Sequence, residues 1–307
     1  MFSEPHRLKT KIYASLPDEL RLVEKTSTWA KGQPVHRRLH SLLEGPCITP
    51  AGQFFCVDVA HGRIFEIDNG EMRTVVDYDG EPNGLRYHSS GAIFVADYKN
   101  GLMKFDPVTY RLTHEVDRYR AEGFRGVNDL CFSPNGDLYF TDQGLTGLHD
   151  PSGRVFRRTA DGNLEVVLEN IPSPNGLVFN RDGSELYVGV TRDNSIWRIP
   201  ILRDGSVTKV GRFIQMSGGT GPDGLGIDSA GNLLAAHVGL GCVWIFSPRG
   251  EPIARVDSCA GFDTTNLILH PADPSRLFIT EAEAGVILEA DLAPIAKHLA
   301  DQVGNRR

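Results

Sequence analysis

The sequence has few of the features that mark membrane, secreted or nucleic-acid-binding proteins. Its 307 residues include no stretch that approaches the ~20 apolar residues needed to cross a bilayer, and residues 1–20 contain no apolar core of signal-peptide length. The net charge is −7, and the basic runs at 36–38 and at the C-terminus are too short to form a patch. We therefore expect a soluble, cytoplasmic protein with no nucleic-acid or membrane partner.

Cysteine is also sparse. The five cysteines are odd in number, widely separated and without metal-type spacing (Cys47, Cys56, Cys131, Cys242 and Cys259), which favours reduced thiols in or near a core. The sequence also lacks the nucleophile elbow Gly-x-Ser-x-Gly, the phosphate-binding Gly-x-x-x-x-Gly-Lys-Ser/Thr loop and the His-Glu-x-x-His zinc motif. No enzyme class built on those three motifs is supported.

Glycine and proline, by contrast, are abundant, with 33 and 18 residues, as in chains rich in turns. The tetrapeptide Pro-Asn-Gly-Leu stands at 82–85 and again at 174–177, and Pro-Asp-Gly-Leu stands at 222–225. We interpret each as a turn signal ahead of an alternating apolar run. Alignment on this signal gives six units, which begin at residues 44, 83, 128, 175, 223 and 266.

Each unit has the pattern of several short strands. An apolar strand leads into a polar turn, a second strand of alternating character follows, and most units add a third. The units recur every 39 to 48 residues, which is the length of a propeller blade of about four strands. The sequence therefore predicts an all-β fold, a six-bladed β-propeller with a central channel, as one domain over residues 1–307.

A propeller must also pair its chain ends, because an open blade edge leaves backbone donors and acceptors unsatisfied. The sixth unit ends near Leu292, and a polar tail follows at 293–307. The lead at 1–42 should therefore supply the closing strand. Its two candidates are KIYASLP (11–17) and RLVEKTS (21–27).

One position of the repeat carries only amides and carboxylates. Because the innermost strand of every blade lines the channel, equivalent residues form a polar ring around the axis: Glu44, Asn83, Asn128, Asn175, Asp223 and Asn266. Such oxygen donors suit Ca²⁺, and a divalent cation would offset the repulsion between Glu44 and Asp223. Mg²⁺, Mn²⁺, Zn²⁺ or Fe²⁺ are alternatives. Another is a local role in which these side chains cap the innermost strands.

A second set of equivalent residues lies 14 or 15 positions after the ring, at the end of the next strand: Asp58, Asp97, Asp142, Val190, His237 and Glu281. Two hypotheses fit this strand-end set. Its members either end the strand at a turn, or they support the polar ring by orienting its side chains. His237 carries the side chain type that titrates near neutrality, so it is the candidate for proton exchange.

Five phrases at blade spacing resemble the SMP-30/gluconolactonase/LRE-like family over residues 40–292. They are LLEGP (42–46), VNDLCFSPNGDLYFTD (127–142), PNGLVFNRDGSELYV (174–188), GPDGLGIDSAGNL (221–233) and TNLILHPADPSRLFITEA (265–282). The resemblance implies one catalytic divalent metal in the channel mouth, held by Glu44, Asn128, Asn175 and Asp223, with Asp223 as general base or nucleophile. Mammalian members carry a substrate-touching arginine two residues before the second of these ligands. Here that position is Gly126, which argues against sugar-acid specificity of the mammalian type.

These features lead to a hypothesis of metal-dependent lactone hydrolysis, in which Asp223 assists the attack of water on a polarised carbonyl. The candidates for substrate contact or for support of the ring are Asn83, Asp97, Asp142, Arg125 and His237. The alternatives are a phosphotriesterase at the same site and a non-catalytic binding scaffold. The loops at 98–103, 118–127, 143–152 and 213–222 are expected to select the substrate, with Tyr98, Phe124, Arg125, Leu145 and Met216 as candidate walls.

Overall fold

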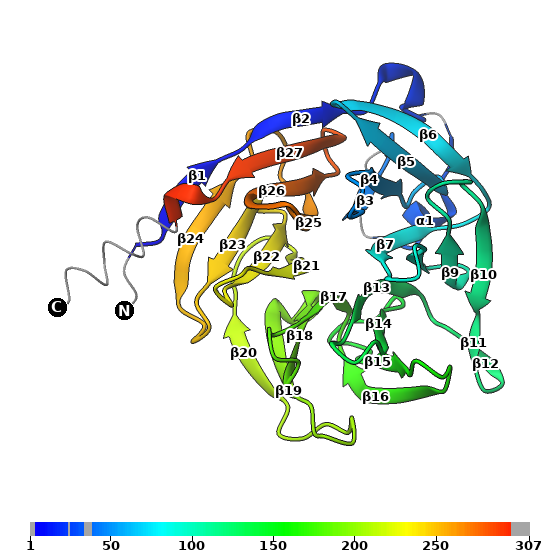
Figure 1. Ribbon diagram of the computed structural model, residues 1–307, viewed down its shortest axis with the longest axis vertical. Helices are drawn as coiled ribbons and strands as arrows, with labels where there is room; N and C mark the ends of the chain where they lie inside the picture. The colour runs from blue at the N-terminus through cyan, green and yellow to red at the C-terminus, as the bar shows by residue number, and fades with distance from the viewer. Residues whose placement is uncertain (1–3, 24, 34–38, 296–307) are drawn as a thin grey trace.

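Six β-sheets stand like blades around a central axis (Figure 1). The computed structural model describes residues 4–23, 25–33 and 39–295. Within this part of the chain, the six repeats correspond to the six sheets, so the predicted six-bladed β-propeller is confirmed. No helix within the described ranges has the length and apolar character to cross a membrane.

The blades follow the chain in order, and consecutive strands within a blade pair antiparallel. The first two blades consist of β3 (Leu43–Ile48), β4 (Phe54–Asp58), β5 (Arg63–Asp68), β6 (Glu71–Asp77), and of β7 (Pro82–Tyr87), β8 (Ile93–Asp97), β9 (Gly101–Phe105), β10 (Leu112–Val116). The next two consist of β13 (Val127–Phe132), β14 (Leu138–Asp142), β15 (Gly153–Arg158), β16 (Leu164–Ile171), and of β17 (Pro174–Phe179), β18 (Glu185–Val190), β19 (Ser195–Pro200), β20 (Gly211–Gln215). The last two contain β21 (Gly221–Ile227), β22 (Leu233–Val238), β23 (Cys242–Phe246), β24 (Pro252–Asp257), and β25 (Thr264–His270), β26 (Asp273–Glu281), β27 (Val286–Asp291).

Short elements connect or flank the blades. They are a hairpin of β11 (Arg118–Tyr119) and β12 (Glu122–Gly123), the 3-10 turns η1 (Asp18–Leu20) and η2 (Thr191–Asp193), and the single-turn helix α1 (Thr28–Lys31). Among the described residues, the innermost strands contact one another in a closed circle, β3 to β7, β13, β17, β21, β25 and back to β3. This circle surrounds the channel.

The start of the chain closes the propeller. Strand β2 (Lys11–Ser15) pairs antiparallel with β27 and completes the sixth blade, while β1 (His6–Lys9) adds in parallel to the edge of β24. The closing strand therefore comes from KIYASLP, and the described residues of RLVEKTS, 21–23 and 25–27, form no strand. The polar tail predicted at 293–307 lies outside the described residues from 296 onward.

The apolar residues pack between blades, because each strand directs alternate side chains to its two faces and both faces meet a neighbouring blade. Six buried clusters result, one at each blade interface. Four of the five cysteines are buried free thiols, as expected, but Cys259 is exposed. It follows β24 in a connecting segment rather than in a strand, so it does not reach the core.

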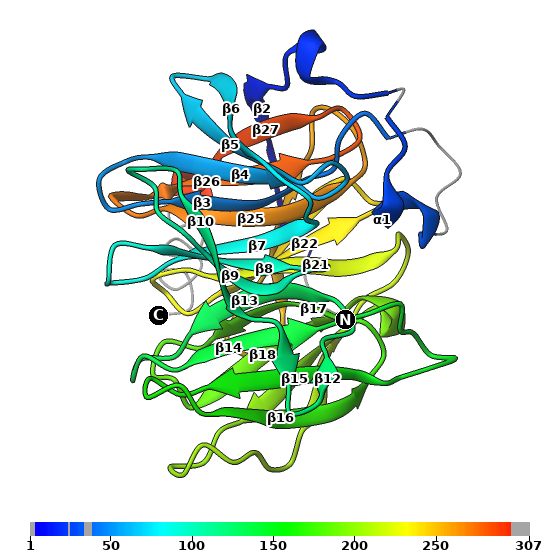
Figure 2. The same ribbon diagram turned by 90° about the vertical axis from the view of Figure 1, so that its right-hand side faces the viewer.

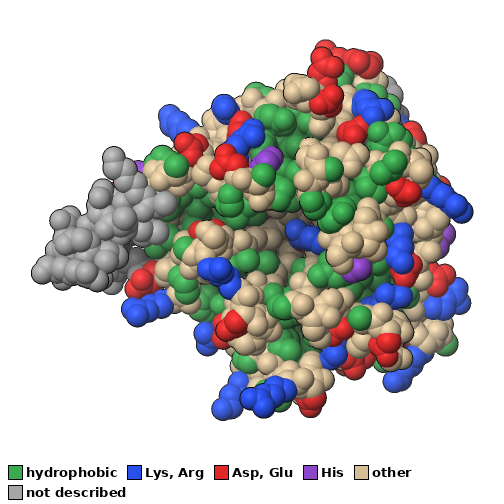
Figure 3. Space-filling model, viewed as in Figure 1, with side chains coloured by type: hydrophobic (Ala, Val, Ile, Leu, Met, Phe, Trp, Pro, Cys, Tyr) green, Lys and Arg blue, Asp and Glu red, His purple; other side chains and the backbone are tan. Residues whose placement is uncertain are grey.

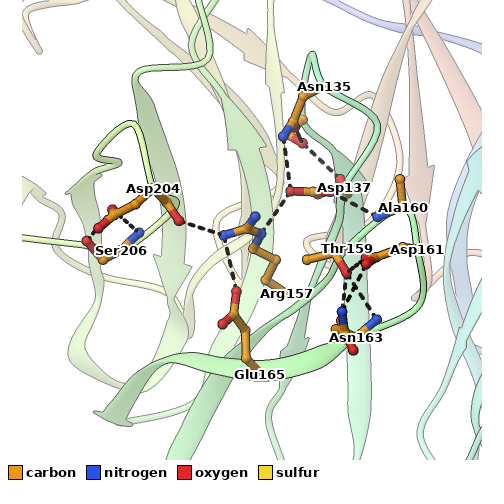
Figure 4. Close-up of polar contacts among 11 residues, drawn as sticks. Asn135, Asp137, Arg157, Thr159, Ala160, Asp161, Asn163, Glu165, Asp204 and Ser206 are labelled. Atoms are coloured by element: carbon orange, nitrogen blue, oxygen red, sulfur yellow. Dashed lines mark hydrogen bonds and ion pairs between the residues drawn. The ribbon is translucent and has the colours of Figure 1, made fainter.

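Polar contacts also join neighbouring blades away from the axis (Figure 4). Arg157 of β15 donates to Asp137 at 2.8 Å and pairs with Glu165 at 3.1 Å. The same guanidinium reaches the backbone carbonyl of Asp204, in the β19–β20 connection of the next blade. Arg157 therefore links the third and fourth blades, and the carboxylates of Asp137 and Glu165 are both engaged with its guanidinium.

The four acidic members of the strand-end set share one structural role. Asp58 accepts the backbone N–H of Leu42, Asp97 that of Glu81, and Glu281 that of Asp263. Asp142 accepts two, from Arg125 at 2.7 Å and Gly126 at 2.9 Å. Each of these amides lies two or three residues before a ring residue, so the carboxylates hold the segments that lead into the ring.

Asp142→Ala is expected to lower the free energy of unfolding by about 3–5 kcal/mol, since it removes the partner of a buried charge. Asp142 is fully buried, and its ion-pair partner Arg154 has a side chain only 8% exposed. Urea unfolding measures the change. Asp182→Ala, in the exposed turn before β18, is the control and should leave stability unaltered. Equal losses in both variants would contradict the structural role of Asp142.

Candidate functional site

A register shift marks the position of the polar ring in every innermost strand. The pairing with the next strand slips between Pro82 and Leu85 in β7, between Val127 and Leu130 in β13, and at the equivalent place in the other four blades. Such bulges commonly re-aim a side chain beside a functional site. The Pro-Asn-Gly-Leu sequence, interpreted above as a turn, therefore lies inside the innermost strand and forms its irregular start.

The glycine of this motif is required because neighbouring innermost strands approach closely at the axis. A Cβ on Gly176 would lie 2.3 Å from the carbonyl oxygen of Asp223, and one on Gly224 would lie 2.1 Å from Oδ1 of Asn266. A Cβ on Gly84 would lie 2.4 Å from Oδ1 of Asp129. Any larger residue would push the strands apart, so the repeat keeps glycine for packing and the preceding amide or carboxylate for the ring.

Five of the six ring residues line one cavity of about 180 Å³ in the channel mouth, namely Glu44, Asn83, Asn128, Asn175 and Asp223. The upper walls come from connecting segments, including Gln143, Ser173, Arg192 and Asp263. The N-terminal segment contributes Trp29, Gln33 and Leu39, and Figure 2 shows α1 at this end of the propeller. Figure 3 shows the opposite end of the propeller, since α1 lies on the far side in that view, and the surface there is also hollowed at the axis.

The sixth ring residue does not line this cavity. Asn266 donates from Nδ2 to Oε2 of Glu44 at 2.8 Å and accepts the backbone N–H of Leu267 on Oδ1. Both ends of its amide are therefore engaged, and its contact is with Glu44 rather than with the cavity. Asn266 therefore holds Oε2 of Glu44, the same oxygen that accepts the backbone N–H of Gly45.

Two ring asparagines direct amide oxygens into the site. Asn128 donates from Nδ2 to Oε1 of Gln143 at 3.0 Å, and Gln143 in turn donates to Ser173 at 3.0 Å. With its nitrogen used in this way, Asn128 has Oδ1 left for the cavity. Oδ1 of Asn175 is buried and has no hydrogen-bond partner among the described residues. A buried oxygen without a donor is costly, so this atom points to a missing electropositive partner.

Carboxylates are crowded around the ring. Burial raises the pKa of Glu44 to about 8, and the nearby charge of Asp129 adds to the shift. Burial, followed by the charges of Glu44 and Asp129, raises the pKa of Asp223 well above its usual value, while the charge of Arg192 opposes the change. Ionising these carboxyl groups together is unfavourable because their negative charges repel one another. A divalent cation bound between them would reduce that repulsion.

Asp129 is a site residue that the sequence analysis missed. Its Oδ1 accepts the N–H of Leu130 and lies 4.0 Å from the guanidinium of Arg86, whereas Oδ2 is buried without a partner among the described residues. Burial raises the pKa of Asp129, and Arg86 opposes that shift. The signal was present in the repeat, since Asp129 occupies the position at which four of the other units have glycine.

The donor set fits a hard cation. Among the described residues, no three His, Cys, Asp or Glu side chains lie close enough to hold a metal by themselves, so any cation here would depend on amide oxygens as well as carboxylates. Glu44, Asp223 and the amide oxygens of Asn128 and Asn175 form such a mixed set. Oxygen ligands of this kind are those of Ca²⁺, and the lack of thiolate and imidazole argues against a zinc-type site.

The other predicted residues lie in different places. Asn83 lines the cavity, but Asp97 and Asp142 are buried in the backbone contacts described above. His237 also lies outside the cavity lining. Its Nε2 lies 3.0 Å from the carbonyl of Gly218, and burial lowers its pKa. Arg125 is directed away from the ring, toward the carbonyl of Ser152.

Among the described residues, none of the five predicted walls lines the channel-mouth cavity, and Leu145 lines a neighbouring cavity. Phe124 packs against Phe140 and Phe156 with ring centroids 5.4 and 5.3 Å away, and Met216 is buried. Tyr98 lies against Gly126, where a Cβ would be 2.4 Å from its ring. The Tyr98 ring thus occupies the space that an arginine at position 126 would need.

The fold and the site together define a six-bladed β-propeller with a polar, carboxylate-containing site at one mouth of its channel. The particular family follows from sequence comparison. The pattern of the SMP-30/Gluconolactonase/LRE-like region matches residues 42–283, and the chain belongs to that family.

Two curated relatives are lactonases by name. A gluconolactonase of Zymomonas mobilis is 35% identical over 203 residues, which cover 60% of this chain and 56% of that protein. Lactonase drp35 of Staphylococcus aureus is 31% identical over 228 residues, covering 70% of this chain and 69% of that protein. The chain thus matches only a little over half the length of the first relative.

Solved structures of similar shape show the fold. A calcium-binding protein, regucalcin, from Agrobacterium tumefaciens superposes with a TM-score of 0.74 at 24% identity, covering 93% of this chain and 95% of that one. A gluconolactonase from Xanthomonas campestris gives a TM-score of 0.73 at 23% identity, covering 82% of this chain and 86% of that one. Both similarities bear on the propeller fold alone.

Proposed function

We propose that this protein opens the ring of a small lactone by hydrolysis, with a divalent cation, Ca²⁺ first among the candidates, held by Glu44, Asn128, Asn175 and Asp223. The observation that carries the proposal is the unpartnered Oδ1 of Asn175 beside two crowded carboxylates at the base of an open cavity. The family and its lactonase relatives supply the reaction class.

The bound cation would supply positive charge that polarises the lactone carbonyl and stabilises the oxyanion. Asp223 is placed to take a proton from water as the water oxygen attacks the carbonyl carbon. The ring C–O bond then breaks, and Asp223 returns the proton to the departing alkoxide. Burial favours this role because it raises the basicity of the carboxylate. Asn128 and Asn175 contribute oxygen without further negative charge.

Proton release from a panel of five- and six-membered lactones tests this function, because each hydrolysis yields a carboxylic acid that ionises. We expect rates well above spontaneous hydrolysis, and loss of that excess when a chelator removes the cation. If no lactone is hydrolysed but phosphotriesters are, the protein is a phosphotriesterase rather than a lactonase. A flat panel with no bound cation would indicate a binding scaffold.

A further inference from the structure

A second and larger cavity adjoins the cavity of the polar ring. It has a volume of about 610 Å³ and is lined by Gly32, Gln33, the loop 143–149, Ser173 and Arg192. Gln33, Gln143, Ser173 and Arg192 line both cavities. We call the larger cavity the annex. The ring cavity alone, at about 180 Å³, is below the ~300 Å³ at which ligand pockets usually begin, so a substrate larger than a bare lactone ring would extend into the annex.

The annex differs from the ring cavity in charge. The ring cavity is lined by Glu44, Asp223 and Asp263, whereas no described residue that lines the annex is acidic. Its polar groups are instead one guanidinium, from Arg192, with the side chains of Gln33, Gln143, Thr146, His149 and Ser173. The side chains of Gln33, Gln143, His149 and Ser173 can donate hydrogen bonds to a ligand, whereas Thr146 already donates its hydroxyl to the carbonyl of Gln143. Arg192 adds a full positive charge.

Arg192 is available for a ligand. Its neighbour Asp193 would be the obvious partner, but Arg212 already pairs with Asp193 at 2.9 Å. Ser195 donates to the same carboxylate. Within the part of the chain that the structure describes, no hydrogen bond or ion pair engages Arg192 itself. An arginine left unpaired at the boundary of two cavities is a ready partner for carboxylate or phosphate.

The backbone around Arg192 is held in place. Arg192 lies in η2, where Thr191 donates from Oγ1 to the carbonyl of Pro222 at 2.7 Å and from its backbone N–H to Ser173 at 3.0 Å. Across the annex, Thr146 donates to the carbonyl of Gln143 at 2.6 Å and accepts the N–H of Ser173 at 2.9 Å. The backbone of Ser173 therefore bonds to both Thr191 and Thr146, which fixes the backbone on both sides of the annex. Little further backbone ordering would accompany the binding of a ligand.

We propose that the annex binds an anionic substituent, a carboxylate or a phosphate, carried by the lactone, and that Arg192 is its charge partner. This inference rests on the proposed function and names its substrate class. The lactone carbonyl would lie over the polar ring while the anionic group lies in the annex. The anion would also be kept apart from Glu44 and Asp223, which would repel it in the ring cavity.

The test compares lactones of one ring size with a neutral, a carboxylate or a phosphate substituent, in the wild type and in Arg192→Gln. We expect the wild type to prefer an anionic member. Arg192→Gln should lower kcat/KM for that member about 10- to 100-fold, mainly through KM, because a charge-assisted contact is lost. The loss for the neutral lactone should be much smaller, so the preference for the anionic member should fall in Arg192→Gln, and in the wild type that preference should weaken at high salt.

Arg203→Gln is the matched control, since Arg203 is an exposed arginine of the same blade that lines a different cavity. An equal loss for neutral and anionic lactones in Arg192→Gln would overturn the proposal, and so would a wild type that prefers neutral apolar lactones. Hydrolysis of all lactones without discrimination would leave the proposed function intact and refute the anionic site alone.

A binding measurement keeps the inference testable even if no lactone is hydrolysed. Calorimetry with lactams, which match the lactone ring but resist hydrolysis, would compare a phosphate-bearing with a neutral member. Tighter binding of the anionic lactam that is lost in Arg192→Gln supports the annex. Equal affinities for both lactams in the wild type contradict it, whatever the catalytic result.

Discussion

Asp223→Asn is expected to reduce kcat/KM for lactone hydrolysis about 1000-fold, within the range lost when a general base is removed. The variant loses a proton acceptor and one of the two carboxylates proposed to hold the cation. Asp228→Asn is the matched control, because it makes the same change just beyond the far end of β21, in a turn where Asp228 accepts local hydrogen bonds. That control should keep the wild-type rate.

Thermal unfolding separates this effect from misfolding. Asp223 lies close to the charges of Glu44 and Asp129, which raise its pKa. Removing its charge should therefore leave the cation-free protein as stable as the wild type or more so, although activity is lost. A cation-free variant that unfolds at a much lower temperature would attribute the loss of activity to folding, and native-rate hydrolysis by Asp223→Asn would remove the proposed base.

Cation binding is expected to become much tighter as pH rises from 6 to 8. Burial raises the pKa of Glu44 to about 8, so below that pH the cation must displace a proton from the site. Each displaced proton makes the apparent affinity rise about tenfold per pH unit. Calorimetric titration with Ca²⁺ at several pH values measures the slope, and Glu44→Gln should flatten it.

The stability of the cation-free protein should run in the opposite direction. A folded-state pKa of about 8, against 4.5 as the ordinary value for glutamate, means that the folded chain retains a proton that the unfolded chain releases. The corresponding stabilisation is complete below pH 4.5 and is lost as pH rises toward 8. The rise in melting temperature on adding Ca²⁺ should therefore be larger at pH 8 than at pH 6. A rise that does not depend on pH would contradict the link.

The repeat made the fold and the ring predictable from sequence. Strand alternation and turn residues are local properties, and their recurrence at blade length leaves few architectures other than a propeller. Aligning the units then placed Glu44, Asn128, Asn175 and Asp223 at one depth of the channel, because every innermost strand follows the same path. The repeat thus allowed residues far apart in the sequence to be assigned to one site.

Contacts between segments far apart in the chain were not predictable in this way. Pro-Asn-Gly-Leu contains turn-forming residues, but it lies in a strand because Gly176 must fit against the neighbouring blade. The backbone partners of Asp142 depend on how the loop at 125–126 passes over it. Trp29 reaches the channel mouth only through the path of the N-terminal lead, which the sequence analysis assigned to closure alone.

The most direct test of the account is a cation titration of chelator-treated protein during lactone hydrolysis. We predict that activity is absent at the start, returns with added Ca²⁺ and saturates at one equivalent per chain. Glu44→Gln should need far more Ca²⁺ to recover, while Asp228→Asn should follow the wild type. Full hydrolysis by the cation-free protein, or an unchanged titration in Glu44→Gln, would contradict the claim that the polar ring holds a catalytic cation.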